Sequence, residues 1–85
     1  MPHGRPALDG IRILDFTRAQ QGPFATMLLC DMGAEVIKVE PPEGDAVRAS
    51  ALGFAGWNRG KRSVVLDLKT PEGLATFYEM VRTAD

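Results

Sequence analysis

The chain has 85 residues, of which 45% are hydrophobic and 25% are charged, and its formal net charge is −1. This length predicts one small domain, and the near-neutral charge argues against general attraction to nucleic acid or to an anionic membrane. The longest apolar run, residues 24–30, is too short to span a bilayer, and no apolar signal-peptide core opens the chain. The single cysteine, Cys30, excludes an internal disulfide and suits a reducing compartment. We therefore expect a cytoplasmic location without membrane or nucleic-acid partners.

The first third of the chain carries the pattern of a strand followed by a helix. Residues 1–8, rich in Pro, Gly and charge, predict a flexible leader. Residues 11–16 have the β-branched and aromatic composition of a strand. Pro23 suits the first turn of a helix, and Gly33 suits the position just past its end. The apolar side of this helix is expected to consist of Phe24, Leu28 and Met32, widened by Ala25 and Leu29.

The remaining two thirds predict two more strands and one more helix. Residues 36–39 read as a second strand, and the irregular segment 43–60, rich in Gly and Ala, predicts a long loop with one short helical turn. Residues 63–68 read as a third strand, after which Thr70 caps a helix that begins at Pro71. This last helix should turn an apolar face toward a sheet through Leu74, Phe77, Tyr78 and Val81.

Strands that alternate with helices predict parallel pairing through right-handed crossovers. The expected fold is α/β, a Rossmann-like parallel sheet with flanking helices, here a three-stranded β-α-β-β-α piece. A typical sheet has about five or six strands, so we expect this one to be incomplete. Open parallel sheets bind ligands beyond the carboxyl ends of their strands. The segments expected at that edge are residues 17–22, 40–44 and 69–73.

Polar side chains at two of these junctions could hold a ligand. Gln20 and Gln21 offer amide donors and acceptors after the first strand, and Gly22 lets the backbone approach a ligand closely. After the third strand, Lys69 is suited to a phosphate, and Asp67 falls on the same face by strand alternation. Asp67 could orient the lysine or be a solvated edge residue. The glutamines could equally form a solvated loop.

Other charged residues have competing interpretations. Arg59, Lys61 and Arg62 form a basic cluster near Trp57 that could meet phosphates. We favour a solvated loop paired with carboxylates for Arg59 and Lys61, and leave Arg62 open.

Glu40 ends the second strand about 20 residues past the first loop, where a dinucleotide fold uses an acidic residue on the ribose. The glycine fingerprint is missing, so NAD and FAD are not expected, and Glu40 is interpreted as a salt-bridged rim residue.

Metal chemistry and histidine-based catalysis have no support in the sequence. The only histidine, His3, lies in the leader, and the only cysteine, Cys30, lies in an apolar helical pattern. Metal sites and Ser-His-Asp triads need several such residues together. We therefore expect no metal.

Two long motifs carry a resemblance to a known family. The first covers residues 20–29 and 33–40, and the second covers residues 58–73. Both resemble the N-terminal end of the family III CoA-transferases, whose relatives include formyl-CoA transferases, carnitine CoA-transferases and α-methylacyl-CoA racemases. The resemblance runs from about residue 8 to residue 85. It implies that residues 9–85 are the N-terminal part of such a domain, truncated here.

The resemblance also implies where coenzyme A would bind. In the formyl-CoA transferase branch, the two residues before Gly-Pro contact CoA, and these are Gln20 and Gln21 here. The segment that runs along the CoA corresponds to Leu66, Asp67, Leu68 and Lys69. Some members have an arginine just after the position of Glu40. Pro41 stands there in this chain, so this contact is either lost or made by another residue such as Arg48.

Members of the family move CoA from an acyl-CoA to a free carboxylic acid through an intermediate on an aspartate, and fold as homodimers. That aspartate lies downstream in the family and matches none of Asp9, Asp15, Asp31, Asp45 and Asp67. The resemblance therefore assigns no catalytic residue, and the 85 residues alone are expected to be inactive. The alternatives are a racemase of the same family and a non-catalytic nucleotide-binding or interaction module.

Overall fold

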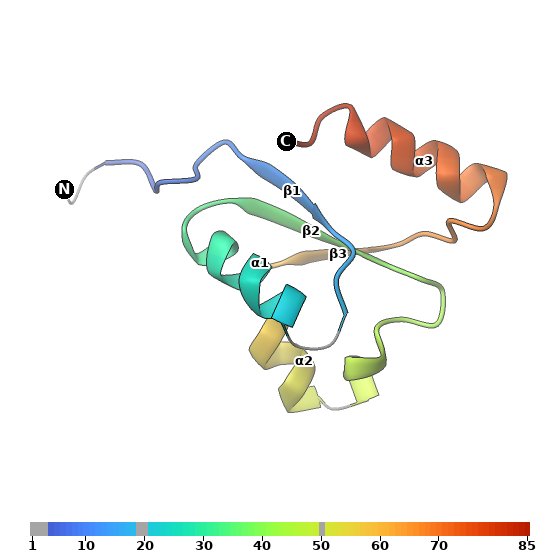
Figure 1. The fold of residues 1–85 in the computed structure, drawn as a ribbon, viewed down its shortest axis with the longest axis horizontal. Helices are drawn as coiled ribbons and strands as arrows, with labels where there is room; N and C mark the ends of the chain where they lie inside the picture. Colours follow the sequence, from blue (N-terminus) through green and yellow to red (C-terminus); the bar gives the residue numbers. More distant parts are fainter. Residues whose placement is uncertain (1–3, 19–20, 50) are drawn as a thin grey trace.

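The computed structural model describes residues 4–18, 21–49 and 51–85, which form a central sheet with helices on both sides (Figure 1). In chain order the elements are β1 (Arg12–Asp15), α1 (Gln21–Asp31), β2 (Glu35–Glu40), the 3-10 helix η1 (Ala46–Ala49), α2 (Ala51–Asn58), β3 (Arg62–Val65) and α3 (Pro71–Val81). The three predicted strands and both predicted helices are present. The predicted α/β fold with a parallel sheet and flanking helices is confirmed.

The sheet has the order β1-β2-β3, and both pairs are parallel. Asp15 of β1 lies opposite Lys38 of β2, and Glu40 of β2 lies opposite Val65 of β3. Because the strands are parallel, Asp15, Glu40 and Val65 all end their strands at the same edge of the sheet. The central strand β2 is the most buried of the three.

The expectation of a long loop over residues 43–60 was wrong, since η1 and α2 occupy most of it. A parallel pair needs a crossover of about a dozen residues or more, usually a helix, and α2 is the crossover between β2 and β3. Its glycines, Gly53 and Gly56, lower its intrinsic helix propensity. Packing on α1 compensates, with the rings of Phe24 and Trp57 edge to face at 5.4 Å.

The buried side of α1 differs from the predicted one. Pro23 and Met27 are buried, whereas Phe24, Leu28 and Met32 remain 42%, 40% and 50% exposed. The helix is apolar on more than one side, so periodicity alone does not determine which side faces the sheet.

The start of α3 follows the prediction. Thr70 Oγ1 accepts a hydrogen bond from the Gly73 N–H at 3.0 Å, and Pro71 is the first residue of the helix. The Thr70 hydroxyl thus satisfies one of the amides that have no partner within the helix.

The body of α3 packs less closely than the sequence pattern indicates. It lies on the opposite side of the sheet from α1 and α2 (Figure 1), and none of its residues is buried. Of the predicted sheet-facing residues, Phe77 meets Phe16 edge to face at 4.9 Å. Tyr78 and Val81 remain 58% and 46% exposed. Beyond the helix, the Asp85 N–H donates to the Arg12 carbonyl at 2.8 Å, which brings the chain back to β1.

The interior combines a small apolar core with an unusual number of buried polar groups. Among the described residues, the buried apolar side chains are Pro23, Met27, Ala34, Val36 and Val39, and the buried polar ones are Asp15, Lys38, Glu40, Asp45 and Asn58. Charged groups are rarely buried unless they are paired, so these residues need partners. Within the described residues, no helix combines the length and apolar character needed to cross a membrane.

Candidate functional site

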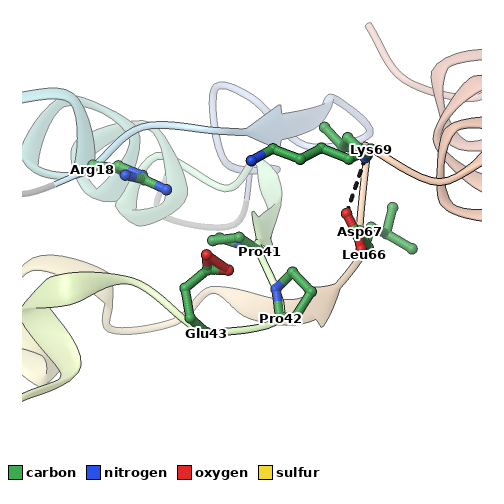
Figure 2. A pocket seen from close by; sticks show the side chains of 8 residues that line it. Arg18, Pro41, Pro42, Glu43, Leu66, Asp67 and Lys69 are labelled. Atoms are coloured by element: carbon green, nitrogen blue, oxygen red, sulfur yellow. Dashed lines mark hydrogen bonds between the residues drawn. The ribbon is translucent and has the colours of Figure 1, made fainter.

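A hollow of about 300 Å³ opens at the carboxyl edge of the sheet (Figure 2). We call it the carboxyl-edge hollow; its lining residues are Arg18, Pro41, Pro42, Glu43, Leu66, Asp67, Leu68 and Lys69. Arg18 belongs to the loop after β1, residues 41–43 to the loop after β2, and residues 66–69 to the loop after β3. All three loops therefore contribute one wall each, at the edge where parallel sheets bind ligands.

A second hollow, of about 370 Å³, lies at the opposite edge of the sheet. Its lining includes Arg12 and Glu35, which begin β1 and β2. Arg12 is already engaged, because its Nε donates to Glu35 at 2.7 Å and its Nη1 donates to Thr83 at 2.9 Å. Although this hollow is somewhat larger, the carboxyl edge is the better candidate site.

Asp15, the last residue of β1, organises the loop that carries Arg18. Its Oδ1 accepts hydrogen bonds from the Thr17 N–H at 2.7 Å and from the Thr17 hydroxyl. Its Oδ2 accepts from Thr26 of α1 at 2.7 Å and from Lys61 at 2.8 Å. Burial raises the pKa of Asp15, but these hydrogen bonds outweigh it, so the pKa lies below the usual range of an aspartate. Asp15 is therefore a charged anchor for this wall.

Lys61 is the buried partner of Asp15, and the expectation that it lies in a solvated loop was wrong. Its side chain is 2% exposed. The ammonium donates to Asp15 at 2.8 Å, to Asn58 Oδ1 at 2.8 Å and to the Pro23 carbonyl at 3.1 Å. These three bonds use all three lysine donors. Lys61 thus joins the start of β3 to the end of β1 and to α1 and α2.

Glu40 anchors the loop after β2. It is salt-bridged, as the sequence indicated, but it is buried rather than on the rim. Arg48 donates to both carboxylate oxygens, at 2.7 and 2.6 Å, and Ser63 donates to Oε2. The bonds from Arg48 outweigh burial and, with those from Ser63 and the Asp45 N–H, lower the pKa of Glu40 to about 2. Arg48 also lies over the Phe54 ring at 4.0 Å, so it is committed to this network and lies outside the hollow's lining.

Lys38 connects the first two walls. Its ammonium donates to the Thr17 carbonyl at 3.0 Å and lies 2.9 Å from Asp45 Oδ2, with both side chains of the ion pair 2% exposed. The contact with Asp45 lacks good hydrogen-bond geometry, so Oδ2 relies on charge attraction. Burial raises the pKa of Asp45, but the Val47 amide and Lys38 outweigh it and hold the pKa below its usual range.

The third wall is shaped by the turn between β3 and α3. The Leu66 N–H donates to the Glu40 carbonyl at 2.9 Å, which continues the sheet into this loop. Asp67 Oδ1 accepts the Lys69 N–H at 3.0 Å, as the dashed line in Figure 2 marks. Asp67 therefore orients the lysine backbone rather than its ammonium group, which resolves one question that the sequence left open.

We expect Gly73→Ala to destabilise the chain by about 1–3 kcal/mol, because overpacking forces the backbone to move. A Cβ at Gly73 would lie 2.0 Å from the Asp67 carbonyl oxygen. Gly56→Ala is the matched control, since a Cβ there meets nothing within 4 Å; it should stabilise α2 by about 0.5–1 kcal/mol. Urea unfolding measures both, and equal stabilisation by the two variants would contradict this packing.

The structure brings some of the predicted site residues together and not others. Leu66, Asp67, Leu68 and Lys69 all line the carboxyl-edge hollow. Gln21 is exposed at the first position of α1 and is not among the lining residues. Gln20 lies outside the described residues. Gly22 packs closely against Thr17, because a Cβ added at position 22 would lie only 2.4 Å from the Thr17 Cβ. Glycine is therefore needed here for the packing of the loop after β1.

Sequence reasoning missed Arg18 as a lining residue, although the segment that contains it was expected at this edge. The basic cluster is divided by the structure. Arg59 pairs with Asp31 at 2.7 Å, as expected, and Arg62 lies 3.6 Å from Glu35. Neither of them lines the hollow.

Comparison with known proteins gives a consistent family. Residues 8–85 match the sequence profile of CoA-transferase family III. The chain is 47% identical to the succinate–glutarate CoA-transferase of Agrobacterium fabrum (strain C58), over 100% of this chain and 25% of that protein. It is also 47% identical to the formyl-CoA:oxalate CoA-transferase of Rhodopseudomonas palustris (strain BisA53), over 93% of this chain and 21% of that protein.

Solved structures agree with the sequence relatives. The Rv3272 protein of Mycobacterium tuberculosis superposes with a TM-score of 0.90 at 46% identity, covering 96% of this chain and 24% of that protein. A CAIB/BAIF family protein of Brucella suis superposes with a TM-score of 0.91 at 38% identity, covering 96% and 25%. The chain spans about a quarter of the length of these relatives. With its family profile matched over residues 8–85, the chain belongs to CoA-transferase family III.

Proposed function

We propose that this chain is the CoA-binding N-terminal portion of an acyl-CoA:carboxylate CoA-transferase. The observation that carries the proposal is the carboxyl-edge hollow, whose lining contains the whole segment Leu66–Lys69 that the family resemblance assigns to CoA. Two cations, Arg18 and Lys69, are exposed in this lining, and CoA is a polyanion. The two relatives described above are named as CoA-transferases, which supports the same ligand class here.

In the proposed reaction, the carboxylate of an enzyme aspartate attacks the thioester carbonyl of the donor acyl-CoA. This step forms a mixed anhydride and releases CoA thiolate. The thiolate then attacks the resulting anhydride, which leaves CoA on the enzyme aspartate as a thioester and frees the donor acid. The acceptor carboxylate then attacks the aspartyl thioester, which forms a second anhydride and releases CoA thiolate. The thiolate attacks the acceptor acyl group of this anhydride, which gives the new acyl-CoA and regenerates the aspartate. Covalent catalysis of this kind divides one difficult step into easier ones.

The attacking aspartate is proposed to lie outside the 85 residues, and the contacts of the aspartates in the chain agree with this. Asp15 and Asp45 are buried beside lysines. Asp9 and Asp31 pair with arginines, and Asp67 and Asp85 accept backbone amide hydrogen bonds. We assign no catalytic residue in this chain and propose that the 85 residues alone bind CoA without transferring it.

The proposed CoA contacts are Gln20, Gln21, Leu66, Asp67, Leu68 and Lys69. Lys69 would pair with a phosphate, whereas Leu66 and Leu68 offer backbone groups and apolar contact along the ligand. Gln20 and Gln21 would meet the pantetheine. In this proposal the protein acts in the cytoplasm as a homodimer, on an acyl-CoA and a small carboxylic acid.

We expect Lys69→Ala to weaken CoA binding by about 1–3 kcal/mol, the usual contribution of a charge-assisted hydrogen bond. Titration of the labelled chain with CoA, followed by backbone NMR shifts, measures the affinity. Arg62→Ala is the control, because Arg62 is exposed and basic but lies outside the lining of the hollow. Shifts confined to residues 58–62 would move the site to that cluster.

A second assay tests the transferase part of the proposal. The chain is incubated with an acyl-CoA and a free acid, and thioester exchange is followed by mass spectrometry. We expect no turnover by the 85 residues. Turnover above a buffer control would show that they contain a nucleophile. In a longer form that contains the downstream aspartate, exchange of the α-proton without CoA transfer would favour the racemase alternative. Binding of nucleotides in preference to CoA would favour a nucleotide-binding module.

A further inference from the structure

The basic side chains divide into two groups according to whether a carboxylate neutralises them. The chain has ten Lys and Arg residues, and all ten lie in the described part. Eight of them have a carboxylate oxygen at 2.6–3.8 Å. The two others are Arg18 and Lys69, whose charged groups make neither an ion pair nor a hydrogen bond with any residue among 4–18, 21–49 and 51–85.

These two cations line the same hollow. They come from different loops, Arg18 after β1 and Lys69 after β3. In Figure 2 the Lys69 side chain extends across the hollow toward the side on which Arg18 lies. Two like charges in one hollow repel each other. An anion bound between them would be attracted to both cations and would offset this repulsion.

The carboxylates in the lining do not neutralise this pair. Asp67 is turned to the Lys69 backbone amide at 3.0 Å. Glu43 is exposed and forms no ion pair within the described residues. Glu43 instead provides a negative charge in the same hollow. Removal of this charge should strengthen the binding of an anion, whereas removal of the Arg18 charge should weaken it.

We propose that Arg18 and Lys69 together bind one phosphate group of CoA, with Arg18 as a ligand-binding residue of this site. The inference rests on the proposed CoA-binding function and deepens it. The planar guanidinium of arginine can bind two phosphate oxygens at once, whereas the lysine ammonium acts as a compact point charge. The two loops thus hold the phosphate from both sides of the hollow.

Binding is measured by NMR titration and calorimetry with four probes: CoA, 3′-dephospho-CoA, pantetheine and inorganic pyrophosphate. The variants are Arg18→Gln, Lys69→Gln and Glu43→Gln, with Arg62→Gln as control. Arg62 is exposed and basic, but it is paired with Glu35 and lies outside the hollow's lining. Thermal unfolding of each variant shows whether the fold is intact; Arg18→Gln should match the wild type, since Arg18 is exposed and unpaired in the described part.

Arg18→Gln is expected to weaken CoA binding about 10-fold, as loss of a charged hydrogen bond does. It should leave pantetheine binding unchanged, because pantetheine has no phosphate. Glu43→Gln should tighten CoA binding about 2-fold, and Arg62→Gln should change nothing. If the effect of Arg18→Gln disappears with 3′-dephospho-CoA, the bound group is the ribose phosphate; if it persists, the bound group is the pyrophosphate.

Two outcomes overturn the role of Arg18: CoA affinity equal to wild type in Arg18→Gln, or equal weakening of CoA and pantetheine. The pyrophosphate probe separates this inference from the proposed function. If pyrophosphate binds through Arg18 and CoA does not bind, the anion site stands and the CoA function fails. If neither probe binds at millimolar concentration, both are overturned.

Discussion

Lys61→Met is expected to lower the free energy of unfolding by about 3–5 kcal/mol, the usual result of removing one partner from a buried ion pair. Methionine keeps most of the length of the side chain but none of its three hydrogen bonds. The Asp15 carboxylate, which is 1% exposed, would keep its charge in a buried position without its cation. The total stability of a domain is about 5–15 kcal/mol, so this single change removes a large part of it. Urea unfolding followed by circular dichroism gives the difference.

Arg59→Met is the matched control, two positions earlier in the sequence. Arg59 also forms an ion pair, with Asp31, but the two side chains are 60% and 43% exposed. Exposed pairs contribute about 0–1 kcal/mol, so this variant should unfold almost as the wild type does. The double variant Asp15→Asn with Lys61→Met should cost less than the sum of the two single changes, because it leaves no lone charge. If Lys61→Met costs no more than Arg59→Met, the buried pair does not stabilise the fold.

The stability of the chain should fall as the pH drops from about 4.5 to about 2, and Glu40 is expected to cause a large part of the fall. Its pKa is about 2 in the folded chain against an ordinary value of 4.5. In this range the unfolded state binds more protons than the folded state, so acid favours unfolding. One pKa unit corresponds to about 1.4 kcal/mol; with solvent screening at the half-exposed Arg48, the loss is about 2–3 kcal/mol.

Glu40→Gln isolates this contribution. The variant should be less stable than the wild type at pH 7, and the difference between them should shrink as the pH falls to about 2. Asp15 and Asp45 also have lowered pKa values, so a smaller acid dependence should remain in the variant. Glu79→Gln, on the exposed surface of α3, serves as control and should keep the full acid dependence. A difference that is constant with pH would contradict the role of the Glu40 carboxylate.

The strands and helix ends could be predicted from the sequence because their signals are local. Runs of β-branched residues mark β2 and β3, and Thr70 with Pro71 marks the start of α3. The helix α2 escaped prediction because Gly53 and Gly56 weaken its local signal, while its stabilisation comes from packing on α1. The need for a crossover between parallel strands was the available clue. Where the local pattern and the topology disagreed, the topology was the better guide.

The candidate site was only partly predictable, for a different reason. The carboxyl ends of parallel strands meet at one edge, and this rule identified the three loops that form the walls of the hollow. Which residues of these loops reach the hollow depends on contacts between residues far apart in the sequence. Lys61 was expected to be solvated because nothing near it in the sequence reveals Asp15 as a partner. Arg18 is distinguished only after the partners of every other basic residue are known.

The Asp15–Lys61 bond also has a kinetic consequence. β1 and β3 lie on opposite sides of β2 and do not pair with each other, yet this bond joins them across 46 residues of chain. A contact with such a large sequence separation closes a long loop, and that closure costs chain entropy before the contact can form. We therefore expect the bond to form late in folding, after both crossovers have brought the outer strands into position. An interaction that is absent from the folding transition state slows unfolding without accelerating folding, so this buried pair should prolong the lifetime of the folded chain rather than hasten its assembly.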